Sequence, residues 1–266
     1  MLPVLFELRI FGGRVSVTSY TFFLTLAAVV LVAIGALVAS RRGLDARRSA
    51  LCLAAGFVAT SIGARLAHWL TNPDSFERGL RSIVAPDRSN LSGYAGLLLG
   101  VPAAAAAARR LGVDAWRLAD SAVPAVALAA VLAKVGCFLN GCCFGGPAEV
   151  PWAVCPSGPD VRLAQIAAGS IGIFDAPLPV HPAQLYEALA ALTGGLVSFW
   201  LLRANARAGA AFLAFAVWFT SFRLLSHLFL RAPLSSAAPG WLYPALYAAV
   251  IVACAGRLIA AAKSAA

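Results

Sequence analysis

The stretch Tyr20-Thr-Phe-Phe-Leu-Thr-Leu-Ala-Ala-Val-Val-Leu-Val-Ala-Ile-Gly-Ala-Leu-Val-Ala39 contains twenty residues and no charged side chain. A helix of about 20 apolar residues spans the ~30 Å hydrocarbon core of a bilayer. Backbone polar groups inside a membrane must be paired within the segment, so the stretch predicts a transmembrane helix. Its basic cluster, Arg41 to Arg48, follows the apolar run, whereas a cleaved signal peptide has its positive charges in front.

The rest of the chain has the same character. Of its 266 residues, 61% are hydrophobic and only 12% are charged, and the mean hydropathy is +0.83. A soluble domain has about 45–50% apolar and about 25% charged residues, which excludes a soluble enzyme. Alternating segments of the outer-membrane barrel type are absent. Six further apolar runs predict spanning helices: Leu51–Leu70, Leu91–Ala108, Leu118–Leu139, Pro182–Leu202, Ala208–Leu230 and Trp241–Leu258.

The expected fold class is therefore an all-α polytopic membrane protein with about seven transmembrane helices. Residues 1–266 are expected to form one integral-membrane domain, with outer-face loops at about 71–90 and 140–181. The run Leu91–Ala108 is the least lipophilic, because it begins with Gly93, Gly96 and Gly100 and continues into a polyalanine stretch. We expect this run to lie inside the bundle.

The placement of charge predicts an outer N-terminus and a cytoplasmic C-terminus. With this orientation the inner segments hold two acids, Asp45 and Asp114, and eleven basic residues: Arg41, Arg42, Arg47, Arg48, Arg109, Arg110, Arg117, Arg203, Arg207, Arg257 and Lys263. An excess of basic residues on the cytoplasmic side is the usual pattern of membrane proteins. It also accounts for the net charge of +10 without a nucleic-acid partner.

Ionisable residues remain within the predicted spans. Arg65, Lys134, Glu187, Arg223 and His227 all fall in the outer halves of their runs. Charges at membrane depth are costly and usually face a cavity or one another. One interpretation is ion pairing that locks the bundle, with Arg65 reaching the outer surface. The other is a polar cavity, open to the outer side, that accepts an anionic headgroup.

Two local motifs carry a family resemblance. They are Lys134-Val-Gly-Cys-Phe-Leu-Asn-Gly-Cys-Cys-Phe-Gly145 and His181-Pro-Ala-Gln-Leu-Tyr-Glu187. Together with Tyr20, Gly63-Ala-Arg65 and Phe222-Arg223, they make the chain similar to the bacterial prolipoprotein diacylglyceryl transferases. The resemblance implies a multi-pass protein of the bacterial plasma (inner) membrane. It implies transfer of a diacylglyceryl group from phosphatidylglycerol to the lipobox cysteine thiol of a secreted prolipoprotein.

The resemblance also implies a set of site residues. The expected partners are phosphatidylglycerol, membrane lipid and prolipoprotein signal peptides, with no cofactor and no metal. Catalytic roles are expected for Tyr94, His181, Arg223 and His227. Substrate binding is expected for Tyr20, Arg65, Lys134, Asn140, Gly141, Gly145, Gln184, Tyr186 and Glu187.

Several positions differ from the family pattern. Tyr94 stands where the family usually has histidine, and Lys134 stands where the signature has arginine. His227 replaces a frequent glutamate. Because tyrosine (pKa about 10) is a poor base, we expect proton removal from the thiol to fall to His181 or His227, with Tyr94 orienting the lipid. The alternative is that no strong base is needed, because a thiol of pKa about 8.5 ionises in part at neutral pH.

Four cysteines, Cys137, Cys142, Cys143 and Cys155, are expected to cluster at the outer face. A disulfide from Cys142 or Cys143 to Cys155, or unpaired structural thiols, is favoured over a metal site, because the spacing matches no standard zinc pattern. Cys137 and Cys142 also replace the signature's Asn and Glu. Two alternative functions stay open: an impaired relative that binds lipid or precursor without transfer, and a small-solute membrane transporter.

Overall fold

The computed structural model describes residues 2–10, 13–71, 93–155, 159–204, 206–230 and 239–263. In these ranges one hairpin precedes eight helices. The strands are β1 (Val4–Ile10) and β2 (Gly13–Thr18). The helices are α1 (Ser19–Arg41), α2 (Ala46–Thr71), α4 (Gly93–Arg110), α5 (Ala115–Asn140), α6 (Pro159–Ala167), α7 (Ala183–Arg203), α8 (Ala210–Phe229) and α9 (Leu242–Lys263).

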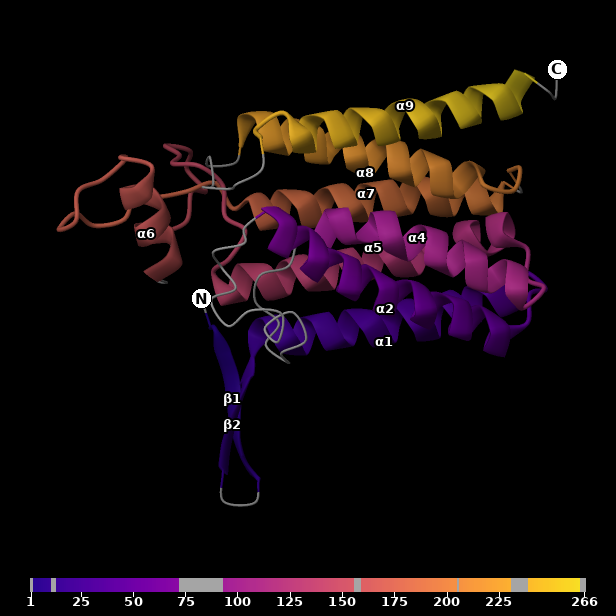
Figure 1. Ribbon diagram of the computed structural model, residues 1–266, viewed down its shortest axis with the longest axis horizontal. Helices are drawn as coiled ribbons and strands as arrows, with labels where there is room; N and C mark the ends of the chain where they lie inside the picture. The colour runs from indigo at the N-terminus through magenta and orange to yellow at the C-terminus, as the bar shows by residue number, and fades with distance from the viewer. Residues whose placement is uncertain are drawn as a thin grey trace.

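The seven predicted apolar runs correspond to the seven long helices, which lie alongside one another as a bundle (Figure 1). All but α4 are long and apolar enough to cross a membrane. The fold class of a polytopic helical membrane protein is therefore confirmed. Large apolar side chains such as Val58, Leu189 and Val252 are exposed on the outside of the bundle, as lipid contact requires.

The expectation that α4 lies inside the bundle is wrong. One face of α4 packs closely on α2, and much of the rest of the helix is exposed. A Cβ atom on Gly96 would lie 2.3 Å from the Thr60 carbonyl oxygen, and one on Gly100 would lie 1.8 Å from the Thr60 hydroxyl oxygen. The glycines therefore serve a close helix–helix contact of the small-residue type. Leu98 and Val101, on the opposite face of α4, are exposed.

The antiparallel hairpin β1–β2 was not anticipated by the all-helical expectation. It pairs Glu7 with Ser16 and Arg9 with Arg14, and it projects from the end of the bundle that holds the N-terminus (Figure 1). The alternation of apolar and polar residues over Phe6–Ile10, followed by the Gly12-Gly13 pair, is an ordinary sequence signal of a hairpin. The strands are too short for the twenty-residue window that identifies spans.

Most of the predicted inner basic residues lie at or near the turns that join α1 to α2, α4 to α5 and α7 to α8. These turns are at the other end of the bundle, near the C-terminus (Figure 1). There Arg48 Nη1 donates to the Leu111 carbonyl at 3.2 Å, and Arg117 Nη2 donates to the Arg42 carbonyl at 2.6 Å. These cations satisfy carbonyls near helix C-termini, where positive charge is favourable. The bundle thus has one basic end, while its orientation across a membrane stays a prediction.

Asp120 belongs to this basic end as well. The buried carboxylate on α5 accepts from the backbone N–H groups of Gly209 at 2.7 Å and Phe212 at 2.9 Å. It therefore caps the N-terminus of α8 from a neighbouring helix, which satisfies two donors that have no partner within α8 itself. This intramembrane acid has a structural role, remote from the charged groups described next.

Candidate functional site

A buried carboxylate joins three helices. Glu187, near the start of α7, has no exposed surface. Its Oε1 accepts from Arg223 Nη1 of α8 at 2.5 Å, and its Oε2 forms an ion pair with Lys134 Nζ of α5. Removing one partner of a buried ion pair is strongly destabilising, so this contact ties α5, α7 and α8 together. Among the described residues, two cations thus face one anion, which leaves one excess positive charge.

Two tyrosine rings flank the Arg223 guanidinium. Its Cζ lies 5.9 Å from the ring centre of Tyr94 on α4 and 5.8 Å from that of Tyr247 on α9. Its Nη2 also donates to the Tyr247 hydroxyl at 3.2 Å. These contacts are within the range of cation–π interactions. Five helices, α4, α5, α7, α8 and α9, therefore contribute to one charged cluster.

Arg223 retains hydrogen-bonding capacity inside this cluster. A guanidinium carries five N–H donors in a planar fork, and the bonds to Glu187 and Tyr247 use two of them. Within the part of the chain that the structure describes, its buried Nε has no hydrogen-bond partner. A buried donor without a partner is costly, and an anion bound beside Arg223 would satisfy it.

Tyr94 occupies a defined position in the cluster. Its hydroxyl is hydrogen-bonded to the Thr220 hydroxyl at 2.7 Å, and its ring packs edge-to-face on Tyr247 with 4.7 Å between ring centres. Thr220 precedes Arg223 by three residues on α8, on the same face of the helix. Tyr94 thus holds α4 against the arginine-bearing face of α8.

His227 lies one turn beyond Arg223. Its ring centre is 6.0 Å from that of Tyr243 and 6.1 Å from that of Tyr247. Tyr247 therefore contacts both Arg223 and His227. This histidine is part of the same cluster.

His181 lies in a second group, built by the loop after α5. The His181 N–H donates to the Gly146 carbonyl at 3.0 Å, and the Gly145 N–H donates to the His181 carbonyl at 2.9 Å. A Cβ atom on Gly145 would lie 2.6 Å from the Leu230 carbonyl oxygen and 2.7 Å from His181 Cβ. Glycine at 145 is thus required by backbone packing in the protein itself.

Side-chain hydrogen bonds between the loop and α7 also hold this loop in place. Trp152 Nε1 donates to the Tyr186 hydroxyl at 2.6 Å, and His181 Nδ1 lies 3.3 Å from the same oxygen. Gln184 Nε2 donates to the Cys142 carbonyl at 2.6 Å. Gln184 and Tyr186 therefore position the loop on the start of α7, on the α7 segment that also carries Glu187.

The remaining predicted site residues lie on elements that end or begin on the same side. Tyr20 is the second residue of α1, and Arg65 lies in the last two turns of α2. Asn140 is the last residue of α5, and Gly141 ends that helix with a φ of +79°. Most of the predicted outer loop at 71–90 falls outside the described residues.

Tyr247, Thr220 and Trp152 were missed from the sequence. A signal existed for the first, because Tyr243 and Tyr247 are four residues apart near the start of the last span and so share a helix face. Thr220 and Trp152 carry no charge and stand outside both motifs. Only the packing of α4 and of the loop reveals their contacts.

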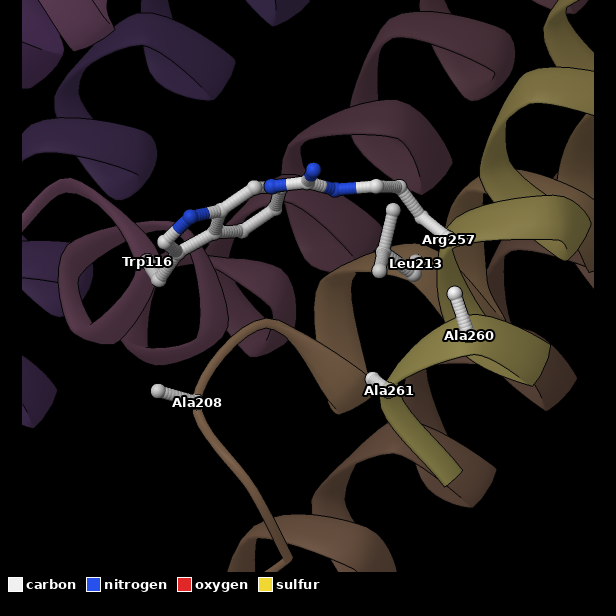
Figure 2. Close-up of a pocket in the computed structure, with 6 residues that line it drawn as sticks. All are labelled: Trp116, Ala208, Leu213, Arg257, Ala260 and Ala261. Carbon is white, nitrogen blue, oxygen red and sulfur yellow. The ribbon is translucent and has the colours of Figure 1, made fainter. Parts of the chain in front are cut away.

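A cavity of about 270 Å³ lies at the basic end, remote from the charged cluster. It is lined by Trp116, Leu213, Arg257 and three alanines (Figure 2). The Arg257 side chain extends toward the indole, with Cζ 5.4 Å from the Trp116 ring centre. A smaller cavity of about 110 Å³ lies beneath α6, next to Gly145 and Gln165.

None of the six cysteines, all of which are described, forms a disulfide. The expected link from Cys142 or Cys143 to Cys155 is therefore not formed. Cys137, Cys142 and Cys143 lie together instead. The pKa of the Cys142 thiol is raised to about 12: its hydrogen bond with Cys137 lowers the pKa, but the hydrogen bond with Cys143 and burial raise it.

Comparison with known proteins agrees with this arrangement. The family model described as prolipoprotein diacylglyceryl transferase matches residues 3–261. The chain is similar to three proteins named phosphatidylglycerol–prolipoprotein diacylglyceryl transferase. It is 32% identical to that of Rhodopirellula baltica over 59% of this chain and 33% of the relative, and 30% identical to that of Geobacillus kaustophilus over 54% of this chain and 51% of the relative. It is 29% identical to that of Geobacter sulfurreducens over 85% of this chain and 81% of the relative.

The aligned part of the chain thus spans a third to about half of the length of the first two relatives. The family match, in contrast, extends over nearly the whole chain and includes both motifs, the helices that carry them and the Arg223 segment. The chain belongs to the prolipoprotein diacylglyceryl transferase family.

Proposed function

We propose that this protein transfers a diacylglyceryl group from phosphatidylglycerol to the lipobox cysteine thiol of secreted prolipoproteins. In this reaction the sulfur forms a bond to the glyceryl carbon that carries the phosphate ester. The bond between that carbon and the ester oxygen breaks, and glycerol phosphate leaves with the electron pair. The proton of the thiol is taken up by a base.

The observation that carries the proposal is the charge balance around Arg223. Lys134 and Arg223 share one carboxylate, Glu187, so the cluster has one excess positive charge. Arg223 also keeps a buried Nε donor. Arginine binds phosphate oxygens through its planar fork, and the bond strengthens as negative charge develops on the leaving group. The cluster therefore suits an anionic phosphodiester and its departure.

The depth of the cluster fits a lipid headgroup. At about 1.5 Å per residue, Lys134 and Arg223 lie roughly 9 Å from the ends of α5 and α8, and Glu187 lies roughly 6 Å from the start of α7. These positions fall between the bilayer midplane and the surface. A transporter is expected to hold its substrate near the midplane, so lipid transfer is the better account of the geometry.

The contacts of the cluster support our proposal for the roles of the substituted positions. Tyr94 orients the lipid through its hydroxyl, which Thr220 holds in place. His227, in contact with Tyr247 beside Arg223, is the base that receives the thiol proton. His181 is a positioning residue for the outer loop, because its backbone bonds to Gly145 and Gly146 of the loop and its Nδ1 faces the Tyr186 hydroxyl of α7.

We further propose that the site opens to the outer face of the bacterial plasma membrane, where the prolipoprotein signal peptide presents its cysteine. The rival function is a relative that binds lipid or precursor without transfer. Complementation separates the two. In cells depleted of their own transferase, the wild-type chain and Arg203→Ala, altered at the basic end, should restore growth, and Arg223→Ala should not. Equal growth with all three would contradict the role of Arg223, and no growth with any would favour the rival.

A further inference from the structure

Three thiols converge where α5 ends. The Sγ atoms of Cys137, Cys142 and Cys143 all lie within 4.8 Å of one another. Cys137 is buried, Cys142 is half-buried and Cys143 is exposed, so the triangle reaches from the bundle interior to the surface. We call these residues the thiol triad. The reaction proposed above does not use them.

The local fold explains how two of the sulfurs meet. The Gly141 N–H donates to the Phe138 carbonyl at 3.2 Å, and the Cys142 N–H donates to the Cys137 carbonyl at 3.1 Å. With Gly141 in the left-handed region at φ +79°, this is the Schellman ending of a helix. That motif brings together the side chains of the residues five apart, here Cys137 and Cys142.

A second left-handed residue adds the third sulfur. Cys143 has a φ of +60°, and it is the single non-glycine residue with a positive φ in the described ranges. Residues other than glycine adopt this conformation rarely, and such strain persists only when the surrounding structure holds it. Gln184 provides that support, because its amide donates to the carbonyl of Cys142 at 2.6 Å.

We propose that the thiol triad binds one thiophilic d¹⁰ metal ion, Zn²⁺ or Cu⁺, through three thiolates. Zinc–sulfur bonds of about 2.3 Å in tetrahedral geometry place the sulfurs about 3.8 Å apart. The triad needs to contract by no more than about 1 Å to reach this spacing. Soft thiolate ligands select these ions over calcium or magnesium.

Binding displaces the three thiol protons to solvent, and neither the metal nor the sulfurs change oxidation state. Three thiolates with Zn²⁺ have a net charge of −1, and Lys134, three residues before Cys137 on α5, lies on the same helix face. Its charge, although paired with Glu187, favours thiolates nearby. Zinc with three protein ligands keeps one coordination position for water or another thiol. The sequence alone did not indicate such a site, because Cys137, Cys142 and Cys143 lack the second ligand pair of a standard zinc pattern.

Cys143→Gly is the sharpest variant for testing the site. Glycine adopts a positive φ without strain, so this change removes one sulfur while relieving the backbone. Cys155→Ser, in the same loop, and Cys254→Ser, in α9, remove thiols outside the triad and serve as matched controls. All chains are purified in detergent with reductant, and metal is measured by elemental mass spectrometry after Zn²⁺ or Cu⁺ loading against a competing chelator.

The expected result is one equivalent of metal in the wild type, Cys155→Ser and Cys254→Ser. The affinity should fall at least 100-fold in Cys143→Gly and in Cys142→Ser, and metal should raise the melting temperature only of chains that keep the triad. Preference between the two loading arms identifies the ion. Equal metal content in Cys143→Gly and wild type would overturn the proposal, as would a disulfide within the triad that persists under reductant. The measurement needs no lipid or peptide, so its outcome is independent of the transferase proposal.

Discussion

The Glu187 carboxylate on α7 and the Arg223 guanidinium on α8 meet 2.5 Å apart, with Glu187 fully buried and Arg223 nearly so. Lys134 reaches the other carboxylate oxygen from α5. The same contact that joins three helices therefore sets the charge of the proposed lipid site. The two roles are testable with different variants, because Glu187 supplies the shared negative charge and Arg223 supplies a buried Nε donor that has no partner among the described residues.

Glu187→Gln should destabilise the protein. The change removes the only acid seen in contact with Lys134 and Arg223 among the described residues. Leaving a buried charge uncompensated costs about 3–5 kcal/mol, so the melting temperature in detergent should fall. Phosphatidylglycerol should restore more stability to this variant than to the wild type, because its phosphate replaces the lost anion.

Glu149→Gln is the matched control for that experiment, since Glu149 is exposed on the loop after α5. Its melting temperature should stay at the wild-type value. If Glu187→Gln melted at the same temperature as the control, the ion pairs would contribute nothing to the stability of the bundle.

Arg223→Ala should weaken the binding of an anionic lipid far more than that of a zwitterionic lipid. Hydrogen bonds to charged groups contribute about 1.5–3 kcal/mol, so the affinity for phosphatidylglycerol should fall roughly 10- to 100-fold. Phosphatidylcholine should bind with nearly unchanged affinity, as measured by lipid titration of the purified protein. An equal loss for both lipids would identify Arg223 as purely structural.

Asp120→Asn should lower stability without altering lipid binding. An asparagine oxygen accepts one of the two N–H bonds at the start of α8, but the charge that favours a helix N-terminus is lost. The expected cost is about 1 kcal/mol. A change in the preference for anionic lipid would place Asp120 in the site, against its position at the basic end.

Orientation is testable by cysteine labelling from outside the cell. Ser49, within the predicted inner segment, is buried and unsuitable as a reporter, and two other natural choices, Ser89 and Ser157, fall outside the described residues. Ser170→Cys and Ala204→Cys are exposed alternatives at opposite ends of the bundle. In a chain with Cys143→Ser and Cys155→Ser, Ser170→Cys should be labelled and Ala204→Cys should not. The reverse pattern would invert the topology.

The sequence predicted the spans well because length and hydropathy determine them. Each run of about 20 apolar residues became a helix, and the weakest, at Leu91–Ala108, became α4. Which charged side chains form ion pairs with one another was not predictable from length and hydropathy. That Glu187 pairs with both Lys134 and Arg223 depends on how α5, α7 and α8 pack, and a one-residue helix rotation changes which side chains face one another.

The candidate site could be predicted only in part, because its contacts also depend on how the helices pack. The motifs pointed to His181 and Glu187, and the match at Phe222-Arg223 pointed to Arg223, but neither separated the charged cluster from the loop that holds His181. Tyr247 was missed because a tyrosine in an apolar span is ordinary, and its role follows from contacts with Arg223, Tyr94 and His227. The thiol triad was not predictable either, because its sulfurs meet only through the left-handed backbone conformation of two residues after α5. Hydropathy does not indicate that conformation.

The most direct test is the reaction itself. Purified wild-type protein, Tyr94→Phe, Tyr94→His and Arg223→Ala are incubated with phosphatidylglycerol and a lipobox peptide, and the products are analysed by mass spectrometry. We predict a thioether-linked diacylglyceryl peptide and glycerol phosphate from the wild type, less from Tyr94→Phe, and at least as much from Tyr94→His. Arg223→Ala should give little or none. No thioether product from the wild type or from Tyr94→His, under conditions in which both bind phosphatidylglycerol, would contradict the assignment as a transferase.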